Sequence, residues 1–384
     1  MRRFIGFTLF SLSVALLPVA ANPSFAAPEF ATYIVVLQPN ADHAAAAREF
    51  TGAGWRIQYD YTNVFSGFAI SLPTTAVAGL EHNPRVLYIE RDSEMTASAT
   101  QAPAPSWGLD RIDQRALPLS NSFEYSSIGE GAGVSAYVVD TGVLSTHTDF
   151  GGRVASGYSS INDLVNTTED CNGHGTHVAG TIAGATYGVA KEATIVPVRV
   201  LDCQGSGSTS TVVAGLDWVV ADHTSGPAVA NMSLGGRPSR ALDAAVVRVF
   251  DDGVTIVVAA GNAHTNACTA SPARVAQAIT VGATNATDTR APYSNFGQCV
   301  DLFAPGSYIT SDWITSTTAT NTISGTSMAT PHVTGVAALL LSRTPTLTPS
   351  AVASAIASSA TVGVIADVGP RSPNLLLYSD PLGG

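Results

Sequence analysis

The sequence is poor in charged residues, and Lys191 is the only lysine after residue 99. Charged residues make up 12% of the 384 residues, and 18 lysines and arginines stand against 29 aspartates and glutamates, which gives a formal net charge of −11. Because so acidic a chain is a poor partner for a phosphate backbone, we expect no binding of nucleic acid. The hydrophobic content of 45% and the 35 glycines suit a well-packed globular enzyme rather than a disordered chain.

Long apolar stretches are also missing, except near the N-terminus. The segment "MRRFIGFTLFSLSVALLPVAANPSFAAPEF" has two arginines, an apolar stretch from Phe4 to about Leu17, and small residues at Ser24 and Ala26 that fit a signal peptidase site. A buried core helix is the alternative, but it would leave the charged flank and the small residues unexplained. No later stretch could span a bilayer. We therefore expect residues 1–26 to be a signal peptide and the protein to be a secreted, soluble monomer without stable membrane association.

Cysteines are few, and their number is even. In the oxidising environment outside the cell, Cys171, Cys203, Cys268 and Cys299 predict two disulfides, and these positions alone allow three pairings. A zinc site formed by Cys171, His174, His177 and Cys203 is a rival interpretation, because the first three are spaced three apart. Export favours disulfides, however, and a zinc site would leave the other two cysteines without a role.

The region between residues 28 and 95 combines alternating segments with one segment of helical spacing. The alternating segments are "TYIVVLQP", "FSGFAISLP" and "RVLYIERD", and the helical one is "ADHAAAAREF". This pattern is typical of a small α+β domain. The next stretch, "SEMTASATQAPAPSW", has the composition of a linker. We therefore expect two folding units.

In the rest of the chain, buried strand-like segments alternate with helical ones. The strand-like segments, rich in β-branched residues, are "GVSAYVVD", "ATIVPVRVLD", "AVANMSL" and "VTIVVAAGN", and the helical segments are "GTHVAGTIAGA", "STVVAGLDWVVADH" and "ALDAAVVRVFDD". This order predicts an α/β fold with a parallel sheet covered by helices on both faces. Ligands of such sheets bind at the carboxyl ends of the strands.

Four polar side chains stand at the ends of these segments. Asp140 ends "AYVVD", His174 lies between glycines in "CNGHGTHVAG", Asn262 closes "VVAAGN", and Ser327 precedes an apolar helical stretch in "SGTSMATPHVTG". Read alone, Asp140 or Asn262 would be a turn residue. Together the four supply a nucleophile, a general base, a carboxylate to orient the base and an amide donor for an oxyanion. We therefore predict that His174, held by Asp140, accepts the proton of Ser327.

The histidine closest to Ser327 in sequence is a poor candidate for the base. On a helix that starts at Ser327, His332 lies about 140° around the axis and points away from the hydroxyl. We expect His332, and also His177, to pack inside the protein. Pro331 is expected in the first helical turn, where backbone N–H groups have no helical partner.

Five segments resemble the signature segments of the subtilase family and stand in the same order. They are "YVVDTGV", "NGHGTHVAGTIAG", "NMSLGG", "VVAAGN" and "SGTSMATPHVTG". The resemblance extends from about residue 107 to the C-terminus, and "WGLDRIDQR", "RVLDCQGSGSTS" and the cysteine positions are similar to the proteinase K group and its aqualysin-type secreted bacterial members. It implies a subtilisin-like serine endopeptidase with Asp140, His174 and Ser327 as the catalytic triad and Asn262 in the oxyanion hole.

The resemblance also implies where a protein or peptide substrate would bind. An extended peptide would lie between two segments and form a short antiparallel sheet with them, namely Gly205, Ser206 and Gly207 on one side and Ser233, Leu234 and Gly235 on the other. Ala259, Ala260 and Gly261 resemble a wall of the first specificity pocket, and their small size leaves room for large apolar or aromatic side chains. The expected specificity is therefore broad, with such residues preferred before the cut.

Residues 27–98 resemble the inhibitory, ferredoxin-like propeptide of these proteases. The resemblance implies that this segment acts as an intramolecular inhibitor until the enzyme cuts itself near Ala99, which leaves 99–384 as the catalytic domain. It also implies the disulfide pairings of Cys171 with Cys203 and Cys268 with Cys299.

Structural calcium is implied at two places. Asp301 resembles a position that binds calcium together with backbone carbonyls, here those of Val275 and Gln277. A second group resembles a site near the mature N-terminus and consists of Asp110, Asp113 and Gln114. The sequence departs from the family there, because Ser120 and Ser122 replace residues that often supply further oxygen ligands. Solvated surface acids are the alternative at both places.

Two other classes of function compete with a protease. An α/β-hydrolase esterase would place its serine before the acid and the histidine, in G-x-S-x-G, whereas Ser327 comes last and Ala329 replaces the final glycine. An inactive binding protein of the same fold would lack at least one of the four candidate residues, and none is missing.

Overall fold

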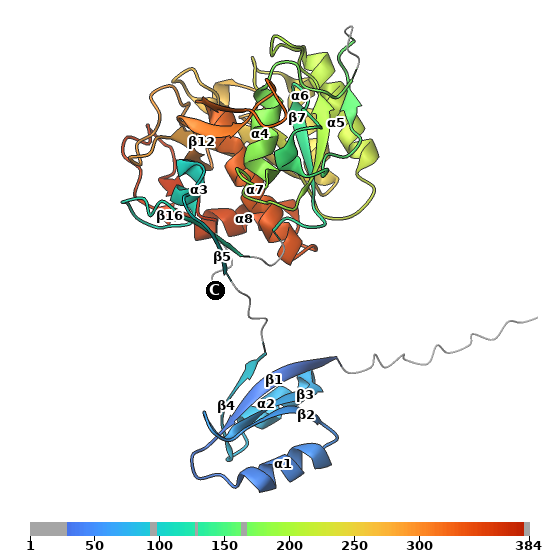
Figure 1. Cartoon of the computed structure of the whole chain (residues 1–384), viewed down its shortest axis with the longest axis vertical. Helices are drawn as coiled ribbons and strands as arrows, with labels where there is room; N and C mark the ends of the chain where they lie inside the picture. Colours follow the sequence, from blue (N-terminus) through green and yellow to red (C-terminus); the bar gives the residue numbers. More distant parts are fainter. Residues whose placement is uncertain (1–28, 93–97, 127–129, 163–166, 380–384) are drawn as a thin grey trace, which may run out of the picture. The chain divides into compact units, whose positions relative to one another are not determined.

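The computed structural model describes residues 29–92, 98–126, 130–162 and 167–379. The chain divides into two compact units, Met1–Met95 and Thr96–Gly384 (Figure 1). Each unit has its own hydrophobic core. The expected signal peptide lies outside the described residues. No helix within the described ranges is long and apolar enough to cross a membrane.

The first unit is an antiparallel sheet with two helices, of which the sequence predicts the first but not the short second one. Its elements follow the order β1 (Phe30–Leu37), α1 (His43–Gly52), β2 (Arg56–Tyr61), β3 (Gly67–Pro73), η1 (Thr74–Ala76), α2 (Val77–Glu81) and β4 (Val86–Arg91). The strand order is β2-β3-β1-β4, and the paired strands are antiparallel. Strand β2 is not evident from the sequence, because its side chains are mostly exposed and show no apolar alternation. This α+β arrangement confirms the expected fold of the N-terminal unit.

The second unit is built on a nine-stranded sheet within the described residues. In the order in which they lie side by side, its strands are β16 (Thr361–Val362), β17 (Leu375–Leu376), β13 (Leu302–Pro305), β12 (Ile279–Thr284), β11 (Thr255–Ala259), β10 (Ala228–Met232), β7 (Ser135–Asp140), β9 (Thr194–Arg199) and β8 (Tyr158–Ser159). All neighbouring strands are parallel except β16 and β17. The four predicted strands correspond to β7, β9, β10 and β11, and all of them are almost completely buried.

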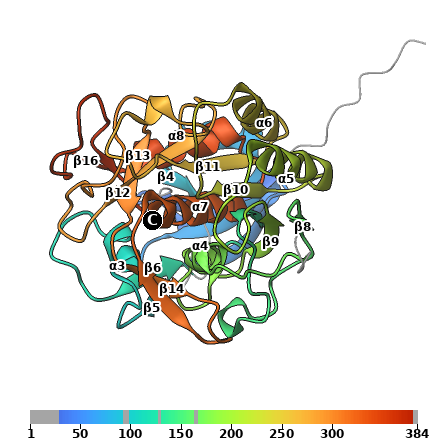
Figure 2. The same cartoon turned by 90° about the horizontal axis from the view of Figure 1, so that it is seen from above.

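Helices cover both faces of this sheet, as expected for a doubly covered parallel sheet. On one face, α5 (Thr209–Asp222) and α6 (Arg240–Asp251) lie side by side over the strands (Figure 2). On the other face, α4 (His174–Ala183), α7 (Thr326–Arg343) and α8 (Pro349–Ser359) share a larger core with the sheet. Helix α7 is buried along nearly its whole length. Its apolar residues point in all directions because other elements surround it.

Short elements complete the second unit. They are α3 (Trp107–Ile112), η2 (Thr148–Phe150), η3 (Ala267–Thr269) and two small antiparallel sheets, β5 (Ser98–Gln101) with β6 (Phe123–Ser126) and β14 (Ile309–Asp312) with β15 (Thr320–Ile323). Lys191 is buried beside the β5–β6 sheet, and its Nζ donates to Gln101 Oε1 and to the carbonyls of Ala185 and Thr186. The only lysine of the chain therefore has a structural role.

Candidate active site

Asp140 and His174 meet at the carboxyl end of strand β7. Asp140 is the last residue of the strand and has no exposed surface, whereas His174 is the first residue of α4 and its side chain is 26% exposed. The Nδ1 of His174 lies 2.7 Å from Oδ1 of Asp140. Gly173 precedes the histidine with φ +108°, and a Cβ there would lie 2.5 Å from the ring of Trp313. A glycine is therefore required at this position for His174 to open the helix.

A second carboxylate, that of Asp170, fixes the segment that carries His174. Asp170 is buried, and its oxygens accept hydrogen bonds from the backbone N–H groups of Asn172, Gly173 and Thr176 and from the hydroxyls of Thr141 and Thr176, at 2.7 to 2.9 Å. Thr141 follows Asp140, and its hydroxyl in turn accepts the N–H of Gly175. Asp170 therefore ties the end of β7 to the start of α4. Nothing in its local sequence distinguishes it from a turn residue.

The environment of His174 favours its protonated form. Burial of the ring lowers the pKa, but the charge of Asp140, its hydrogen bond and the charge of Asp170 outweigh this effect, so that the pKa of His174 is raised above its ordinary value of 6.5. An imidazole with a raised pKa is a stronger base and a more stable imidazolium.

Ser327 is the second residue of α7 and lies in the same cleft as His174. In this structure its hydroxyl donates to the carbonyl oxygen of Ser233 at 3.1 Å rather than to the imidazole. The hydroxyl of Ser233 donates to the carbonyl of Ser327 at 2.8 Å. Ser233, which directly follows β10, therefore bonds both the hydroxyl and the carbonyl of Ser327.

The expectation that Pro331 lies in the first helical turn is wrong, and the bond from Ser233 explains why the proline is tolerated further along the helix. This proline is the sixth residue of α7 and lies beyond the first turn, so its missing N–H leaves the carbonyl of Ser327 without its helical partner. The hydroxyl of Ser233 takes the place of that donor. The sequence does not reveal this compensation, because 94 residues separate the two serines.

Asn262 lies just after β11 and faces the same cleft. Its Oδ1 accepts hydrogen bonds from the backbone N–H of Thr326 at 2.8 Å and from the hydroxyl of Thr326 at 2.9 Å. With the oxygen fixed by two donors, the amide nitrogen has no protein partner among the described residues and is free to donate elsewhere. Asn295 holds the same segment, because its Nδ2 donates to Ala260 and its Oδ1 accepts from Ala263.

The cleft has a volume of about 970 Å³ and is lined by all the residues expected to contact substrate. These are Gly205, Ser206, Gly207, Ser233, Leu234, Gly235, Ala259, Ala260 and Gly261. His174, Asn262 and Ser327 line it as well, whereas Asp140 lies behind His174. Arg237 and Leu242 also line the cleft, and the sequence does not predict this role for either residue.

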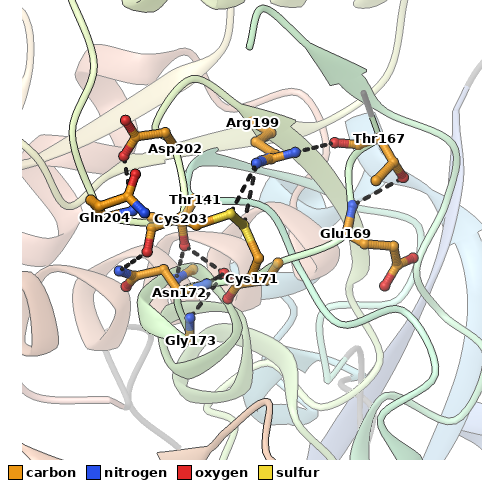
Figure 3. The surroundings of a disulfide bond; sticks show 12 residues. Thr141, Thr167, Glu169, Cys171, Asn172, Gly173, Arg199, Asp202, Cys203 and Gln204 are labelled. Carbon is orange, nitrogen blue, oxygen red and sulfur yellow. Dashed lines mark hydrogen bonds between the residues drawn. A yellow bond between two sulfur atoms is a disulfide. The ribbon is translucent and has the colours of Figure 1, made fainter. Parts of the chain in front are cut away.

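Both disulfides have the pairing that the family resemblance implies. Cys171 is bonded to Cys203 with an S–S distance of 2.04 Å, and Cys268 is bonded to Cys299 at 2.10 Å. The first disulfide joins the segment before His174 to the segment before Gly205, where Asn172 also donates to the carbonyl of Cys203 (Figure 3). Because its cysteines are paired, the alternative zinc site is excluded.

The other two candidate histidines are buried and uncharged. His332 has no exposed surface, its Nδ1 bonds the carbonyl of Met328, and burial lowers its pKa to about 4. His177 bonds the carbonyl of Ile309, and burial lowers its pKa to about 3. Both therefore pack in the core, as expected, and neither is a base for Ser327.

The two groups of calcium candidates lie apart from the cleft lining. Asp301 precedes β13, and its Oδ2 accepts the N–H of Thr280 at 2.8 Å. Its other carboxylate oxygen has no hydrogen bond in the described part of the chain, so this group fits a cation that prefers oxygen ligands. The carbonyl of Val275 already accepts the N–H of Ala278 at 3.1 Å, which leaves one lone pair.

The second group is largely occupied by protein donors. The oxygens of Asp110 accept N–H groups from Ser120 and Asn121, and Gln114 Oε1 also accepts the N–H of Ser120. Within this group, only Asp113 has a buried oxygen without a partner among the described residues, and its pKa is raised to about 6 by burial and by the charges of Asp110 and Glu124. No group of three or more His, Cys, Asp or Glu side chains suited to a metal ion occurs within the described ranges.

Comparison with known proteins identifies the class of enzyme. Residues 131–375 match the model of the subtilase family, and residues 32–98 match the peptidase inhibitor I9 family. The chain belongs to the subtilase family, and it is a serine protease preceded by an inhibitor-type propeptide unit.

Individual relatives agree with this assignment. The chain is 58% identical over 344 residues to the extracellular serine proteinase of Thermus sp. (strain Rt41A), covering 90% of this chain and 83% of the relative. It is 50% identical over 365 residues to the alkaline serine exoprotease A of Vibrio alginolyticus, covering 90% and 67% respectively. A crystal structure of a cold adapted subtilisin-like serine proteinase is 54% identical, with a TM-score of 0.68 over 71% of this chain and 97% of that one. Like the Thermus relative, this protein is secreted.

Proposed function

We propose that the protein is a serine endopeptidase that hydrolyses peptide bonds through an acyl-enzyme. The observation that carries the proposal is the hydrogen bond of 2.7 Å between Asp140 and His174 at the edge of a cleft that also contains Ser327 and Asn262. A buried carboxylate behind a partly exposed imidazole is the arrangement that a general base requires.

The proton of the nucleophile passes to His174. The hydroxyl of Ser327 exchanges its bond to Ser233 for one to Nε2 of the imidazole when it turns towards the substrate. As the oxygen attacks the scissile carbonyl, His174 accepts the proton and later transfers it to the leaving amine. Asp140 holds the Nδ1–H tautomer and stabilises the imidazolium.

The negative charge on the substrate oxygen is bound by two donors. One is the free amide nitrogen of Asn262, and the other is the backbone N–H of Ser327, which lies in the first turn of α7 and has no helical partner. The N-terminus of this long helix also favours negative charge. Thr326 supports the site because it fixes the orientation of the Asn262 amide.

Substrate specificity is proposed to be broad. The peptide would pair with backbone groups of residues 205–207 and 233–235, and such bonds do not depend on side-chain identity. Gly261 has φ +100°, and a Cβ there would lie 2.5 Å from Nδ2 of Asn295. Glycine and the two alanines before it keep one wall of the pocket low, which favours large apolar or aromatic residues before the cut.

Maturation is proposed to be autocatalytic. Residues 1–26 would be removed as a signal peptide, and residues 27–98 would inhibit the catalytic domain of 99–384 until cleavage near Ala99. The match of residues 32–98 to a family of peptidase inhibitors supports this role.

Calcium is proposed as a structural ion at Asp301. The carboxylate of Asp301 and backbone carbonyls of Val275 and Gln277 would hold it, and the ion would supply positive charge beside the Asp301 oxygen that accepts no hydrogen bond from the described residues. The second site at Asp110, Asp113 and Gln114 stays a prediction from the family resemblance.

Two measurements test the proposed reaction. A phosphonylating or sulfonylating reagent should label Ser327 and abolish activity, and the Ser327→Ala variant should take up no label. The enzyme should cleave casein within its chain, whereas an esterase would act only on short esters. Failure to label Ser327 in the mature, folded protein would refute the proposal.

A further inference from the structure

Arg237 is a charged residue on the wall of the cleft that has no structural role. It is exposed, and among the described residues its guanidinium makes no hydrogen bond or ion pair. Of the residues that the structure describes, no aspartate or glutamate lines the cleft, and Arg237 is the only arginine or lysine in the lining. In a chain with a net charge of −11, this position is therefore locally positive against an acidic background.

The backbone on both sides of Arg237 is fixed. Gly236 exchanges two hydrogen bonds with Ser271, from its N–H to the carbonyl of Ser271 at 2.9 Å and back at 3.2 Å. The N–H of Ser239 donates to the hydroxyl of Ser271 at 2.9 Å, and Ser239 also caps helix α6. Because Gly236 before it and Ser239 two residues after it are both bonded to the buried Ser271, the backbone of Arg237 is held at the cleft.

The position of Arg237 relative to the reacting bond follows from the proposed substrate strand. Ser233 touches Ser327 and would lie level with the residue before the cut. In an antiparallel pair, each step along the enzyme moves one residue towards the substrate N-terminus, so Gly235 lies level with the third residue before the cut and Arg237 with about the fifth. A long guanidinium side chain at that level reaches a substrate side chain rather than the scissile bond.

We propose that Arg237 is a specificity-determining residue that selects peptides with a carboxylate about five residues before the cut. This inference rests on the proposed endopeptidase function and refines its substrate class. A guanidinium forms directed hydrogen bonds with a carboxylate, whereas a substrate lysine at the same place would be repelled. The sequence of the chain itself has such a residue, because Glu94, outside the described residues, stands five residues before Ala99.

The effect should be modest because the pair would remain partly exposed to water. Exposed ion pairs correspond to roughly a two- to fivefold difference in kcat/KM, and the difference should shrink at about 0.5 M NaCl through screening. The test measures kcat/KM for a set of peptides that have phenylalanine directly before the cut and alanine elsewhere. Each peptide carries Glu, Gln or Lys at the third, fifth or seventh residue before the cut. We expect the wild type to prefer Glu over Lys at the fifth position only. Arg237→Gln should lose this preference, and Arg237→Glu should prefer Lys.

The matched control is Arg248→Gln. Arg248 is an exposed arginine near the other end of α6 and does not line the cleft, so its replacement changes the net charge equally and should keep the Glu preference. If Gln peptides are cleaved but the Glu to Lys ratio is the same in the wild type and both Arg237 variants, Arg237 has no such role and the proposed protease function stands. If no peptide is cleaved and Ser327 takes no label, both proposals fail.

Discussion

At the scale of single residues, the site depends on side chains whose partners are fixed by neighbours in space. Asp170 ties the segments of Asp140 and His174 together, Ser233 binds both ends of Ser327, and Thr326 orients Asn262. Such preorganised donors and acceptors need little rearrangement during the reaction.

The pH dependence of activity should report the raised pKa of His174. The base must be neutral to accept a proton, so kcat/KM should rise with pH and reach half of its plateau above pH 6.5, the ordinary value for histidine. The measurement is a pH profile of kcat/KM on a neutral peptide. A midpoint at or below 6.5 would contradict the electrostatic effect of Asp140 and Asp170.

Asn262→Ala should lower kcat by about a hundred- to a thousandfold, a range known from the oxyanion-hole asparagine of the related enzyme subtilisin. KM should change little, because the lost hydrogen bond forms mainly in the transition state. Steady-state kinetics on one peptide would measure both constants, with the thermal midpoint as a control for folding. A loss of less than tenfold would remove Asn262 from the mechanism.

At the scale of elements, a buried carboxyl group on the β14–β15 hairpin faces a partly buried one on η2. Asp312 has no exposed surface, and neither of its oxygens has a hydrogen-bond partner within the described ranges. Asp149 is nearby and accepts the N–H of Thr186 with both oxygens. Burial, and then the charge of Asp149, raise the pKa of Asp312 to about 8.

This pKa predicts that Asp312 makes stability depend on pH. Because the folded pKa of about 8 lies above the unfolded value of 3.8, the native state binds more protons between these limits, and stability falls as the pH rises through this window. Asp312→Asn removes the titration, so the melting temperature of the variant relative to the wild type should increase from pH 5 to pH 8. Thermal melts across this range provide the measurement, with the exposed Asp251→Asn as a control. A constant difference across the range would contradict the prediction.

At the scale of the whole molecule, the proposed maturation would separate the N-terminal unit from the catalytic domain. Ser327→Ala should leave the secreted precursor uncut near Ala99, because the proposed cut is made by the enzyme itself. Mass spectrometry of the variant from a protease-deficient host would give the N-terminus. A normally processed variant would show that another protease makes the cut.

Removal of calcium should lower the temperature of inactivation. An ion bound only by the native state adds stability, so EDTA should shift the thermal midpoint of the wild type downwards. In the Asp301→Asn variant, EDTA should have little of this effect. Differential scanning calorimetry with and without EDTA would measure it. An unchanged midpoint in the wild type would argue against a structural calcium ion.

Much of this protein can be predicted from the sequence. The strand-like runs ending at Asp140 and Asn262 lie in the central sheet, and the glycines around His174 and the apolar helix after Ser327 mark the starts of α4 and α7. These features depend on short-range patterns, namely burial of whole strands and the steric freedom of glycine, which the local sequence carries.

The tertiary structure decided the remainder. It brought Ser233 to Ser327 across 94 residues, supplied the donor that Pro331 removes from α7, placed Asp312 beside Asp149, and set Arg237 on the wall of the cleft. The local sequence around these residues does not reveal these contacts. Their roles arise from packing between distant segments, where a hydrogen bond or a charge depends on which side chain lies opposite, and only the folded chain determines that neighbour.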